Sequence, residues 1–339
     1  MRILVTGGAG FIGSQLALYL DKKDHEVIIL DNLSSGYIYN FMESKRLLQN
    51  FVSMDIRDPK IESVTRRVDV IFHIAGYVSL PGCNDNPGEA YSVNTAGTAN
   101  VLEMARRNNV KKVVFASTAA LYEKETLTPF KESLPANPTL IYARSKKDAE
   151  GICVSFREMY GMDITIFRFF NVYGPHMDYR PPSYLISYLI GCLLKKEKPV
   201  LHSNGKQSRD FVYVNDVVRL CEIVMSNPKS KNQTFNVGSG EIISVQGIYD
   251  LLAEIMKLQK IKPVFRDPKM HWEKFPRQFE GKYKFDAELL TNEVNKLTHA
   301  DISKAKELLG WVPKVKMRKG LEKTVEYNIK KKTFSNYRP

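Results

Sequence analysis

Short apolar runs alternate with longer amphipathic stretches through the first half of the chain. The runs are rich in β-branched residues, as is typical of strands buried on both faces of a parallel sheet. The longer stretches at 11–19, 90–108 and 139–160 have the periodicity of helices. This alternation predicts an α/β fold with a doubly wound parallel sheet and right-handed crossovers. The predicted strands span residues 3–6, 26–30, 52–54, 70–74, 113–116 and 164–167.

The alternation loosens after Asn171. Helical patterns at 183–194, 245–256 and 317–329 dominate from there, and a last strand is predicted at 234–237. We therefore predict a smaller, discontinuous and mostly helical second lobe. Residues 1–175 and about 209–237 then form the larger domain, about 176–208 and 238–330 form the smaller lobe, and 331–339 form a tail.

Composition narrows the class of protein. The formal net charge of +13 comes from lysines in short scattered clusters instead of one stripe interleaved with aromatic residues, which argues against nucleic acid as a partner. We find no signal-peptide pattern and no apolar run of the ~18 residues that a membrane-spanning helix needs. Four widely spaced cysteines indicate reduced thiols and a cytoplasmic location, and six histidines without ligand spacing argue against a metal site.

Glycines follow the first predicted strand at the spacing Gly7-x-x-Gly10-x-x-Gly13, directly before a helix. Glycine lets the backbone approach a pyrophosphate closely, and the N–H groups and dipole at the start of the helix stabilise its charge. The second strand ends at Asp31, whose carboxylate can bind an adenosine ribose but would repel a 2′-phosphate, so NAD is favoured over NADP. The alternatives are a turn that serves packing only and an aspartate that caps a turn.

A tyrosine and a lysine, Tyr142 and Lys146, lie four residues apart at the start of the third predicted helix. Their side chains share one helix face, and an ammonium near a phenol lowers the phenol pKa from its usual ~10. Such a tyrosine could accept a proton from a sugar hydroxyl while hydride leaves for a nicotinamide. The spacing alone is also common on helix surfaces. The fifth strand ends in Ser117 and Thr118, which either place a hydroxyl at the same sheet edge or only end the strand.

Together these motifs resemble the extended short-chain dehydrogenase/reductase family. The nearest members are its NAD-dependent nucleotide-sugar epimerases and dehydratases, above all proteins like UDP-glucose 4-epimerase, and the resemblance implies a Rossmann-type fold. It covers nearly the whole chain, with several motifs in the order expected for the family. They are the glycine turn, Asp31-Asn32, Asp55-Ile56, Asn94, Thr118, Tyr142-x-x-x-Lys146 and the segments 168–175, 209–216, 235–240 and 301–313.

The resemblance implies roles for individual residues. Tyr142 is the general base, Lys146 lowers its pKa and holds the nicotinamide ribose, and Thr118 completes a triad. NAD is the implied cofactor, a nucleotide-linked sugar the implied substrate, and a homodimer forms through the helices around 90–108 and 139–160. The expected NAD contacts are Gly7, Gly10, Phe11, Ile12, Gly13, Asp31, Asn32, Ser35, Gly36, Asp55, Ile56, Ala75, Gly76, Tyr77, Asn94, Ser117, Tyr142, Lys146, Phe169 and Val172. The expected substrate contacts are Ser79, Thr118, Tyr142, Asn171, Arg209, Arg266 and Arg277.

The residues that follow Thr118 bear on the reaction. Family members that remove water between C4 and C6 carry an acidic pair there, and decarboxylating members place a glutamate nearby, whereas this chain has Ala119 and Ala120. We therefore expect epimerisation at C4, by transient oxidation to the 4-keto sugar and return of the hydride. The alternatives are a 4-dehydrogenase or 4-keto reductase, a 4,6-dehydratase or decarboxylase that uses an acid from another loop, and a non-catalytic NAD-binding regulator.

Some features depart from the family pattern or have a second interpretation. Glu123 stands where a glycine is typical, and Cys83, where relatives often have serine, is either a second acid-base group or a small buried residue. The segment 266–298 is longer and more aromatic than expected. It either closes over the substrate, with Arg266 or Arg277 as a phosphate or ribose contact, or packs as a surface insert. Arg209 could instead form a structural ion pair, for example with Asp210.

Overall fold

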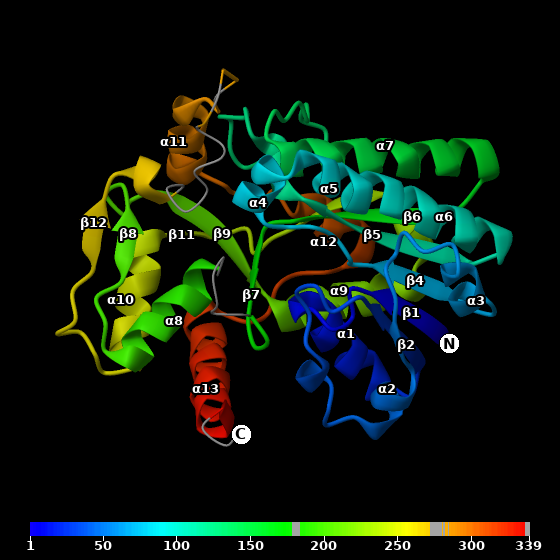
Figure 1. The fold of residues 1–339 in the computed structure, drawn as a ribbon, viewed down its shortest axis with the longest axis horizontal. Helices are drawn as coiled ribbons and strands as arrows, with labels where there is room; N and C mark the ends of the chain where they lie inside the picture. The colour runs from blue at the N-terminus through cyan, green and yellow to red at the C-terminus, as the bar shows by residue number, and fades with distance from the viewer. Residues whose placement is uncertain (178–183, 272–279, 281, 284, 336–339) are drawn as a thin grey trace.

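A parallel sheet of seven strands forms the centre of the larger part of the molecule. Its strands are β1 Arg2–Thr6, β2 Glu26–Asp31, β3 Phe51–Ser53, β4 Val70–His73, β5 Lys112–Thr118, β6 Ile164–Phe169 and β10 Thr234–Val237. They lie in the order β10-β6-β5-β4-β1-β2-β3, so the order reverses between β1 and β4 (Figure 1). The computed structural model describes residues 1–177, 184–271, 280, 282–283 and 285–335. The six strands predicted in the first half of the chain and the predicted strand at 234–237 are confirmed within two residues at each end.

Helices cover both faces of this sheet. Side chains of α1, α9 and α12 join one buried core with the strands, and side chains of α3, α6 and α7 join the other. This arrangement confirms the doubly wound fold, and in Figure 1 α6 and α7 lie on the opposite side of the sheet from α1 and α2. The helices of this part are α1 Phe11–Asp21, α2 Lys45–Gln49, α3 Ile61–Thr65, α4 Leu80–Asp85, α5 Pro87–Tyr91, α6 Gly97–Arg107, α7 Ile141–Tyr160, α9 Val214–Ser226 and α12 Ser303–Leu309.

Helix α7 is bounded by contacts that the sequence pattern only partly reveals. It ends at Gly161, which adopts a left-handed φ of +68° as the C-cap. At the other end the Glu123 carboxylate accepts hydrogen bonds from the backbone nitrogens of Thr139 and Leu140, each at 2.9 Å. Glu123 therefore fixes the start of α7 to the segment that follows β5.

The predicted helix at 90–108 is interrupted. Between α5 and α6 the chain forms a π-helical turn, Ser92–Ala96, which carries Asn94. Such turns are frequent at functional sites, because they break the regular spacing of side chains. Here the turn places Asn94 against the loop that follows β4, where it bonds to the main chain of Tyr77.

The smaller lobe contains two further sheets beside its helices. A three-stranded sheet comprises β7 Asn171–Tyr173, β9 Ser208–Tyr213 and β11 Ile242–Ser244, and β8 Val200–His202 pairs with β12 Val264–Arg266. Although 209–237 is predicted to belong with the larger domain, β9 is therefore not a strand of the main sheet. The sequence predicts none of β7, β8, β9, β11 and β12, and four of these five strands have only three residues, too few to show a clear alternation. The helices of this lobe include α8 Leu185–Lys195, α10 Val245–Ile255, α11 Ala287–Asn295 and α13 Met317–Ser335.

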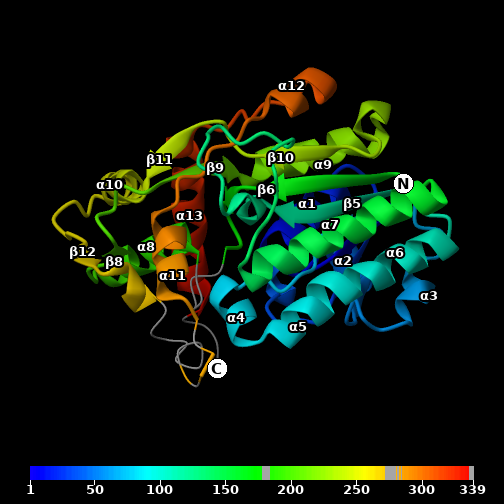
Figure 2. The same cartoon turned by 90° about the horizontal axis from the view of Figure 1, so that it is seen from above.

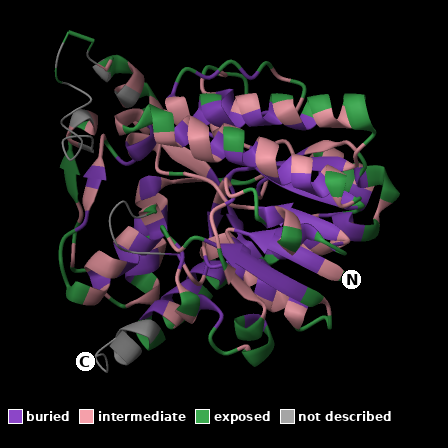
Figure 3. Ribbon diagram, turned by 45° about the vertical axis from the view of Figure 1, so that its right-hand side comes forward, coloured by how far each residue is buried: buried purple, intermediate pink, exposed green. Residues whose placement is uncertain are grey.

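This lobe lies at one end of the molecule, facing the carboxyl ends of the main strands (Figures 1 and 2). Its own core is formed by α8, α10 and α13 with side chains from β9. In Figure 3 the main strands are buried along most of their length, whereas α6 and α7 keep an exposed outer face. Among the described helices, none combines the length and the apolar character needed to span a bilayer.

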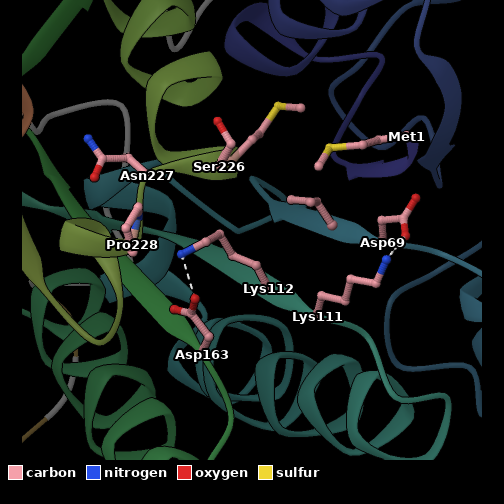
Figure 4. A pocket seen from close by; sticks show the side chains of 10 residues that line it. Met1, Asp69, Lys111, Lys112, Asp163, Ser226, Asn227 and Pro228 are labelled. Atoms are coloured by element: carbon pink, nitrogen blue, oxygen red, sulfur yellow. Dashed lines mark hydrogen bonds and ion pairs between the residues drawn. The ribbon is translucent and has the colours of Figure 1, made fainter.

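A polar pocket of about 170 Å³ opens at the amino edge of the main sheet (Figure 4). Its charged side chains pair with one another: Lys111 with Asp69 and Lys112 with Asp163, each at 2.8 Å. Lys112 Nζ also donates to Ser230 Oγ at 3.1 Å. These two lysines and two aspartates of the lining therefore neutralise each other. Lys112 and Asp163 form a structural ion pair that joins the start of β5 to the residue before β6.

A buried carboxylate, Asp210, joins β9 to two other segments. It accepts hydrogen bonds from the backbone nitrogens of Ser239 at 2.6 Å, Gly240 at 2.9 Å and Ala300 at 3.1 Å. Burial raises the pKa of Asp210, and these hydrogen bonds act in the opposite direction. The partners of the Asp210 carboxylate are therefore backbone donors and the Ser239 hydroxyl, instead of the ion pair with Arg209 that was the structural alternative.

Replacing Asp210 with Asn should lower the free energy of unfolding by about 2–4 kcal/mol, because an amide NH2 would face backbone N–H donors. Urea unfolding followed by circular dichroism measures this loss. Asp148→Asn is the control, because Asp148 forms an exposed ion pair with Arg144, and its loss should stay below about 1 kcal/mol. Equal losses in the two variants would contradict the role assigned to Asp210.

Candidate active site

The glycine turn connects β1 to α1 at the carboxyl edge of the sheet. Gly7 has a φ of +69°, and a Cβ there would lie 2.7 Å from the Ala75 nitrogen, while a Cβ on Gly13 would overlap with the Gly7 oxygen. At Gly10 a Cβ would meet only the Gly7 oxygen among the described residues, at 3.2 Å. The turn is thus closed toward the sheet and open beside the first N–H groups of α1, which begins at Phe11 with no acidic residue in its first turn. This cradle fits a dinucleotide pyrophosphate.

Asp31 lies at the end of β2, beside the glycine turn. Its buried carboxylate accepts hydrogen bonds from the backbone nitrogens of Ala9 at 3.0 Å and Leu33 at 2.7 Å. Burial raises the pKa of Asp31, and these backbone bonds oppose the rise. A Cβ on Gly36 would lie 2.8 Å from the Ala9 carbonyl carbon, so the loop after β2 packs closely on the turn. Asp31 and Gly36 therefore border the place expected for an adenosine ribose.

The ends of β2 and β3 are linked by side chains. Asn32 Nδ2 donates to Asp55 Oδ2 at 2.9 Å, and the Arg57 guanidinium pairs with the same carboxylate at 2.8 Å. The hydrogen bond from Arg57 is the main reason that the pKa of Asp55 falls to about 2. Of the expected NAD contacts in this region, Asn32 and Ser35 are exposed, whereas Ile56 is buried in the core.

The segment that follows β4 crosses over Lys146. A Cβ on Gly76 would lie 3.0 Å from Asn94 Oδ1 and 3.3 Å from Lys146 Nζ. Asn94 Oδ1 accepts a hydrogen bond from the backbone nitrogen of Tyr77 at 2.8 Å. Its Nδ2 donates to the backbone carbonyl oxygen of Tyr77 and to Ser145 Oγ, each at 3.0 Å. Asn94 thus connects the loop after β4 to Ser145 on α7, immediately before Lys146. Its side chain therefore positions that loop against α7.

The three residues expected to be catalytic come together at this edge. The phenol of Tyr142 lies beside the Thr118 side chain, which acts to lower the phenol pKa, and Thr118 Oγ1 accepts a hydrogen bond from the Ala120 nitrogen at 3.1 Å. Lys146 follows one turn later on α7 and is buried, with Nζ 4.6 Å from the centre of the Phe115 ring. The tyrosine, the lysine and the threonine therefore occupy one site.

The pKa of Tyr142 is shifted upward, whereas the sequence predicts that Lys146 lowers it. Burial is the largest cause; the Thr118 side chain acts in the opposite direction, and Tyr184 and Cys83 raise the pKa further. Burial also lowers the pKa of Lys146 to about 8, so part of its charge is lost near neutral pH. No sequence pattern reveals this burial, because it depends on segments far apart in the chain.

A buried histidine near Lys146 was not singled out by the sequence pattern. His73 is fully buried at the end of β4, with Nδ1 2.8 Å from Thr6 Oγ1 and Nε2 3.0 Å from Thr98 Oγ1. Burial lowers its pKa to about 3, so the imidazole is neutral and bridges β1 to α6. The available signal was a single histidine in the otherwise apolar run 70–74.

Some expected contact residues have side chains with structural partners. Ser117 Oγ donates to Glu150 Oε1 at 2.6 Å, and Ser79 Oγ accepts a backbone hydrogen bond at 3.1 Å as the N-cap of α4. Phe169 and Val172 are buried in the core beside α1 and α9. Direct contacts between these four residues and a ligand remain predictions.

Cys83 lies close to the catalytic residues as a protonated thiol. Its Sγ donates to the backbone carbonyl oxygen of Tyr77 at 3.3 Å, and burial raises the pKa of the thiol to about 12. A thiol held in this form is a poor base at neutral pH. The structure therefore favours the interpretation of Cys83 as a small buried residue.

The expected substrate contacts Asn171 and Arg209 lie where the smaller lobe meets the main sheet. Asn171 Nδ2 donates to the backbone carbonyl oxygen of Asp210 at 2.9 Å. Arg209 Nη2 donates to the carbonyl oxygens of Glu293 at 2.8 Å and Val294 at 3.0 Å, in the last turn of α11. Its guanidinium therefore caps that helix, and Asn171 holds the start of β7 to β9.

The remaining two expected substrate contacts do not join the site. Arg266 is exposed on β12, which lies at the outer end of the smaller lobe in both views (Figures 1 and 2). The structure therefore does not bring Arg266 to Thr118 and Tyr142. Arg277 lies outside the described residues.

Replacing Gly13 with Ala should weaken NAD binding by about 10- to 100-fold, because its Cβ would overlap the Gly7 oxygen and force α1 away from β1. Isothermal titration calorimetry measures the affinity. The control is Gly151→Ala on α7, where a Cβ would meet nothing within 4 Å and binding should be unchanged. If Gly13→Ala bound NAD as tightly as the wild type, the glycine turn would not be the pyrophosphate site.

Comparison with known proteins points to the same site. A model of the NAD dependent epimerase/dehydratase family matches residues 3–238. The UDP-glucose 4-epimerase of Mycolicibacterium smegmatis is 31% identical over 331 residues, which cover 96% of this chain and 98% of that protein. Among solved structures, UDP-glucose 4-epimerase with UDP-glucose from Thermotoga maritima has a TM-score of 0.85 and 32% identity, covering 98% of this chain and 99% of that one.

A further solved structure contains the dinucleotide. The Thermus thermophilus UDP-glucose 4-epimerase complex with NAD has a TM-score of 0.81 and 28% identity, covering 96% of this chain and 98% of that one. The family match spans more than half of the chain, and the other similarities extend over nearly all of it. The chain is therefore a member of the NAD-dependent epimerase/dehydratase family, with the Rossmann-type fold and the NAD cofactor of that family.

Proposed function

We propose that this protein epimerises a nucleotide-linked sugar at C4, by transient oxidation to the 4-keto sugar and return of the same hydride. The observation that carries the proposal is the placement of the Tyr142 phenol beside the Thr118 side chain, with buried Lys146 one turn further along α7. This group lies at the carboxyl edge of the sheet, where ligands bind in open α/β folds. The similarity to UDP-glucose 4-epimerases supports the same reaction.

The roles of the three side chains follow from their positions. Tyr142 would accept the proton of the sugar 4-hydroxyl and later return it, while Thr118 holds the same oxygen by a hydrogen bond. Bound NAD supplies the hydride acceptor and a positive ring. Because burial raises the pKa of Tyr142, its ionisation needs positive charge close by. In this proposal protonated Lys146 and the nicotinamide ring would supply that charge.

The residues after Thr118 support epimerisation over dehydration or decarboxylation. Ala119 and Ala120 have no acidic group to protonate or deprotonate C5 or C6. The first acid that follows in sequence is Glu123, whose two oxygens accept hydrogen bonds from Thr139 and Leu140. The Glu123 carboxylate therefore has structural partners. The catalytic groups that remain are Tyr142, Lys146 and Thr118, the minimum set that a 4-epimerase needs.

We also propose a division of labour between the two parts of the chain. Residues 1–175 and about 209–237 would bind NAD, and residues 176–208 and 238–330 would bind the nucleotide sugar. Helices α6 and α7 pack side by side, and α7 exposes Val154, Met159 and Tyr160, which supports a homodimer through these helices. The cytoplasmic location remains a prediction from the four cysteines.

Replacing Tyr142 with Phe should lower kcat by at least about 1,000-fold while NAD affinity stays within about threefold, because only the phenolic oxygen is removed. Steady-state kinetics and calorimetry provide the two measurements. Tyr160→Phe, at the exposed end of the same helix, is the control and should keep wild-type activity. Substantial turnover by Tyr142→Phe would show that another group moves the proton.

The substrate and the fate of the hydride can be read in one experiment. Proton NMR of the enzyme with UDP-, GDP-, CDP- and dTDP-hexoses labelled with deuterium at C4 should show inversion at C4 with the label retained. A 4-dehydrogenase or 4-keto reductase would instead place deuterium on free cofactor or on a second product. Bound NAD with no product from any hexose would favour the non-catalytic regulator.

A further inference from the structure

Behind the catalytic residues lies a buried ion pair between α7 and β6. Arg168 Nε donates to Glu150 Oε1 at 3.0 Å, and its Nη2 donates to Glu150 Oε2 at 2.9 Å. The side chains are only 5% and 7% exposed for Glu150 and Arg168, respectively. Burying two charges is expensive, so such a pair is weak evidence for stability and stronger evidence for fixing a geometry.

The same pair holds the catalytic segment on both sides of Thr118. Ser117, directly before Thr118, donates its hydroxyl to Glu150 Oε1 at 2.6 Å. Arg168 Nη1 donates at 2.9 Å to the hydroxyl of Tyr122, which ends the 3-10 turn Ala119–Tyr122 after Thr118. The two charged residues therefore form hydrogen bonds to the chain just before and just after the catalytic threonine, at Ser117 and Tyr122.

The pair also connects this segment to the helix that carries the other two catalytic residues. Glu150 follows Lys146 by one turn on α7, and its carboxylate opposes the fall in the pKa of Lys146. Tyr122 donates in turn to Asn236 Oδ1 at 2.8 Å, which extends the connection to β10. One network thus reaches from β10 through the segment after β5 to α7.

We propose that the Glu150–Arg168 ion pair is a positioning element that sets the distance between Thr118 and Tyr142. This inference rests on the proposed function, in which these two side chains act on one sugar oxygen. Neither charged residue touches the substrate; they act through the backbone of the segment 117–122 and through α7. A shift of about 1 Å in such a pair can cost about 100-fold in rate.

The molecule contains its own control for this proposal. Lys112 and Asp163 form a second, partly buried ion pair at the amino end of β5, beside the start of β6 (Figure 4). The Lys112 side chain is 7% exposed, like that of Arg168. The Lys112–Asp163 pair lies at the amino ends of β5 and β6, whereas Arg168 lies near the carboxyl end of β6, so only the Glu150–Arg168 pair lies beside the catalytic residues.

The phenol of Tyr142 provides a readout that a general loss of stability would not move. The neighbouring Thr118 side chain lowers its pKa, so a misplaced Thr118 should raise that pKa. Removing the charge of Glu150 by itself would act in the opposite direction, because a nearby carboxylate disfavours the phenolate. The other groups that face the phenol and the Lys146 amine are Tyr184, Cys83, His73 and Cys153.

The test uses the full chain with NAD bound and labelled with 13C at the tyrosine ζ carbons. Glu150→Gln breaks the ion pair without a change of side-chain shape. Ser117→Ala removes the hydrogen bond to Glu150, and Tyr122→Phe removes the hydrogen bond from Arg168; both keep the ion pair. Lys112→Met is the structural control, and Tyr142→Phe assigns the resonance. In Ser117→Ala and Tyr122→Phe, which keep the charge of Glu150, the Tyr142 titration should move up by about one pH unit. With an active substrate, kcat should fall about 100-fold for Glu150→Gln and about 10-fold for Ser117→Ala, with KM nearly unchanged.

Two outcomes would overturn the proposal. One is a Tyr142 titration that stays at its wild-type position in both Ser117→Ala and Tyr122→Phe. The other is an equal shift in Lys112→Met, which would mean that any loss of stability disturbs the site. If the wild type epimerises no nucleotide sugar, the proposed function fails, but the titration still decides whether the ion pair positions Thr118 against Tyr142.

Discussion

The register of the parallel strands is the constraint on which the site depends. Because β1, β4 and β5 run in the same direction, with Thr6 opposite His73 and His73 opposite Phe115, their carboxyl ends meet at one edge. Successive side chains on a strand point to opposite faces, so Ser117 and Thr118 face different partners. A slip of one residue would exchange the two hydroxyls, and the register therefore decides which of them meets the phenol.

Much of this arrangement could be predicted because its signals are local. Buried parallel strands are continuous apolar runs, and the glycine turn is a short motif whose spacing follows from close backbone contacts at Gly7 and Gly13. The four-residue interval between Tyr142 and Lys146 defines one helix face without any knowledge of the rest of the fold. Such features depend on a few neighbouring residues, so the sequence alone was sufficient for them.

The other features arise from contacts between segments that are distant in the chain. The raised pKa of Tyr142 reflects burial together with Tyr184 and Cys83, both more than 40 residues away in the chain, and the helix end that Arg209 caps lies more than 80 residues further on. The side chains of Asn94 and Ser117 could each have contacted a cofactor or a neighbouring element, and only the packing of α7 decides in favour of Tyr77, Ser145 and Glu150. No periodicity in the sequence carries that information.

The pairing of β10 with β6 has a consequence for how the protein is made. The chain leaves the main sheet after β6, builds β7, α8, β8 and β9, and returns only at Thr234 to pair with Ile166. During synthesis on a ribosome, the backbone edge of β6 consequently stays without its neighbour until that later segment has emerged. An uncovered strand edge invites pairing with other nascent chains, so the interval between these two strands is the stage at which this protein is most exposed to aggregation.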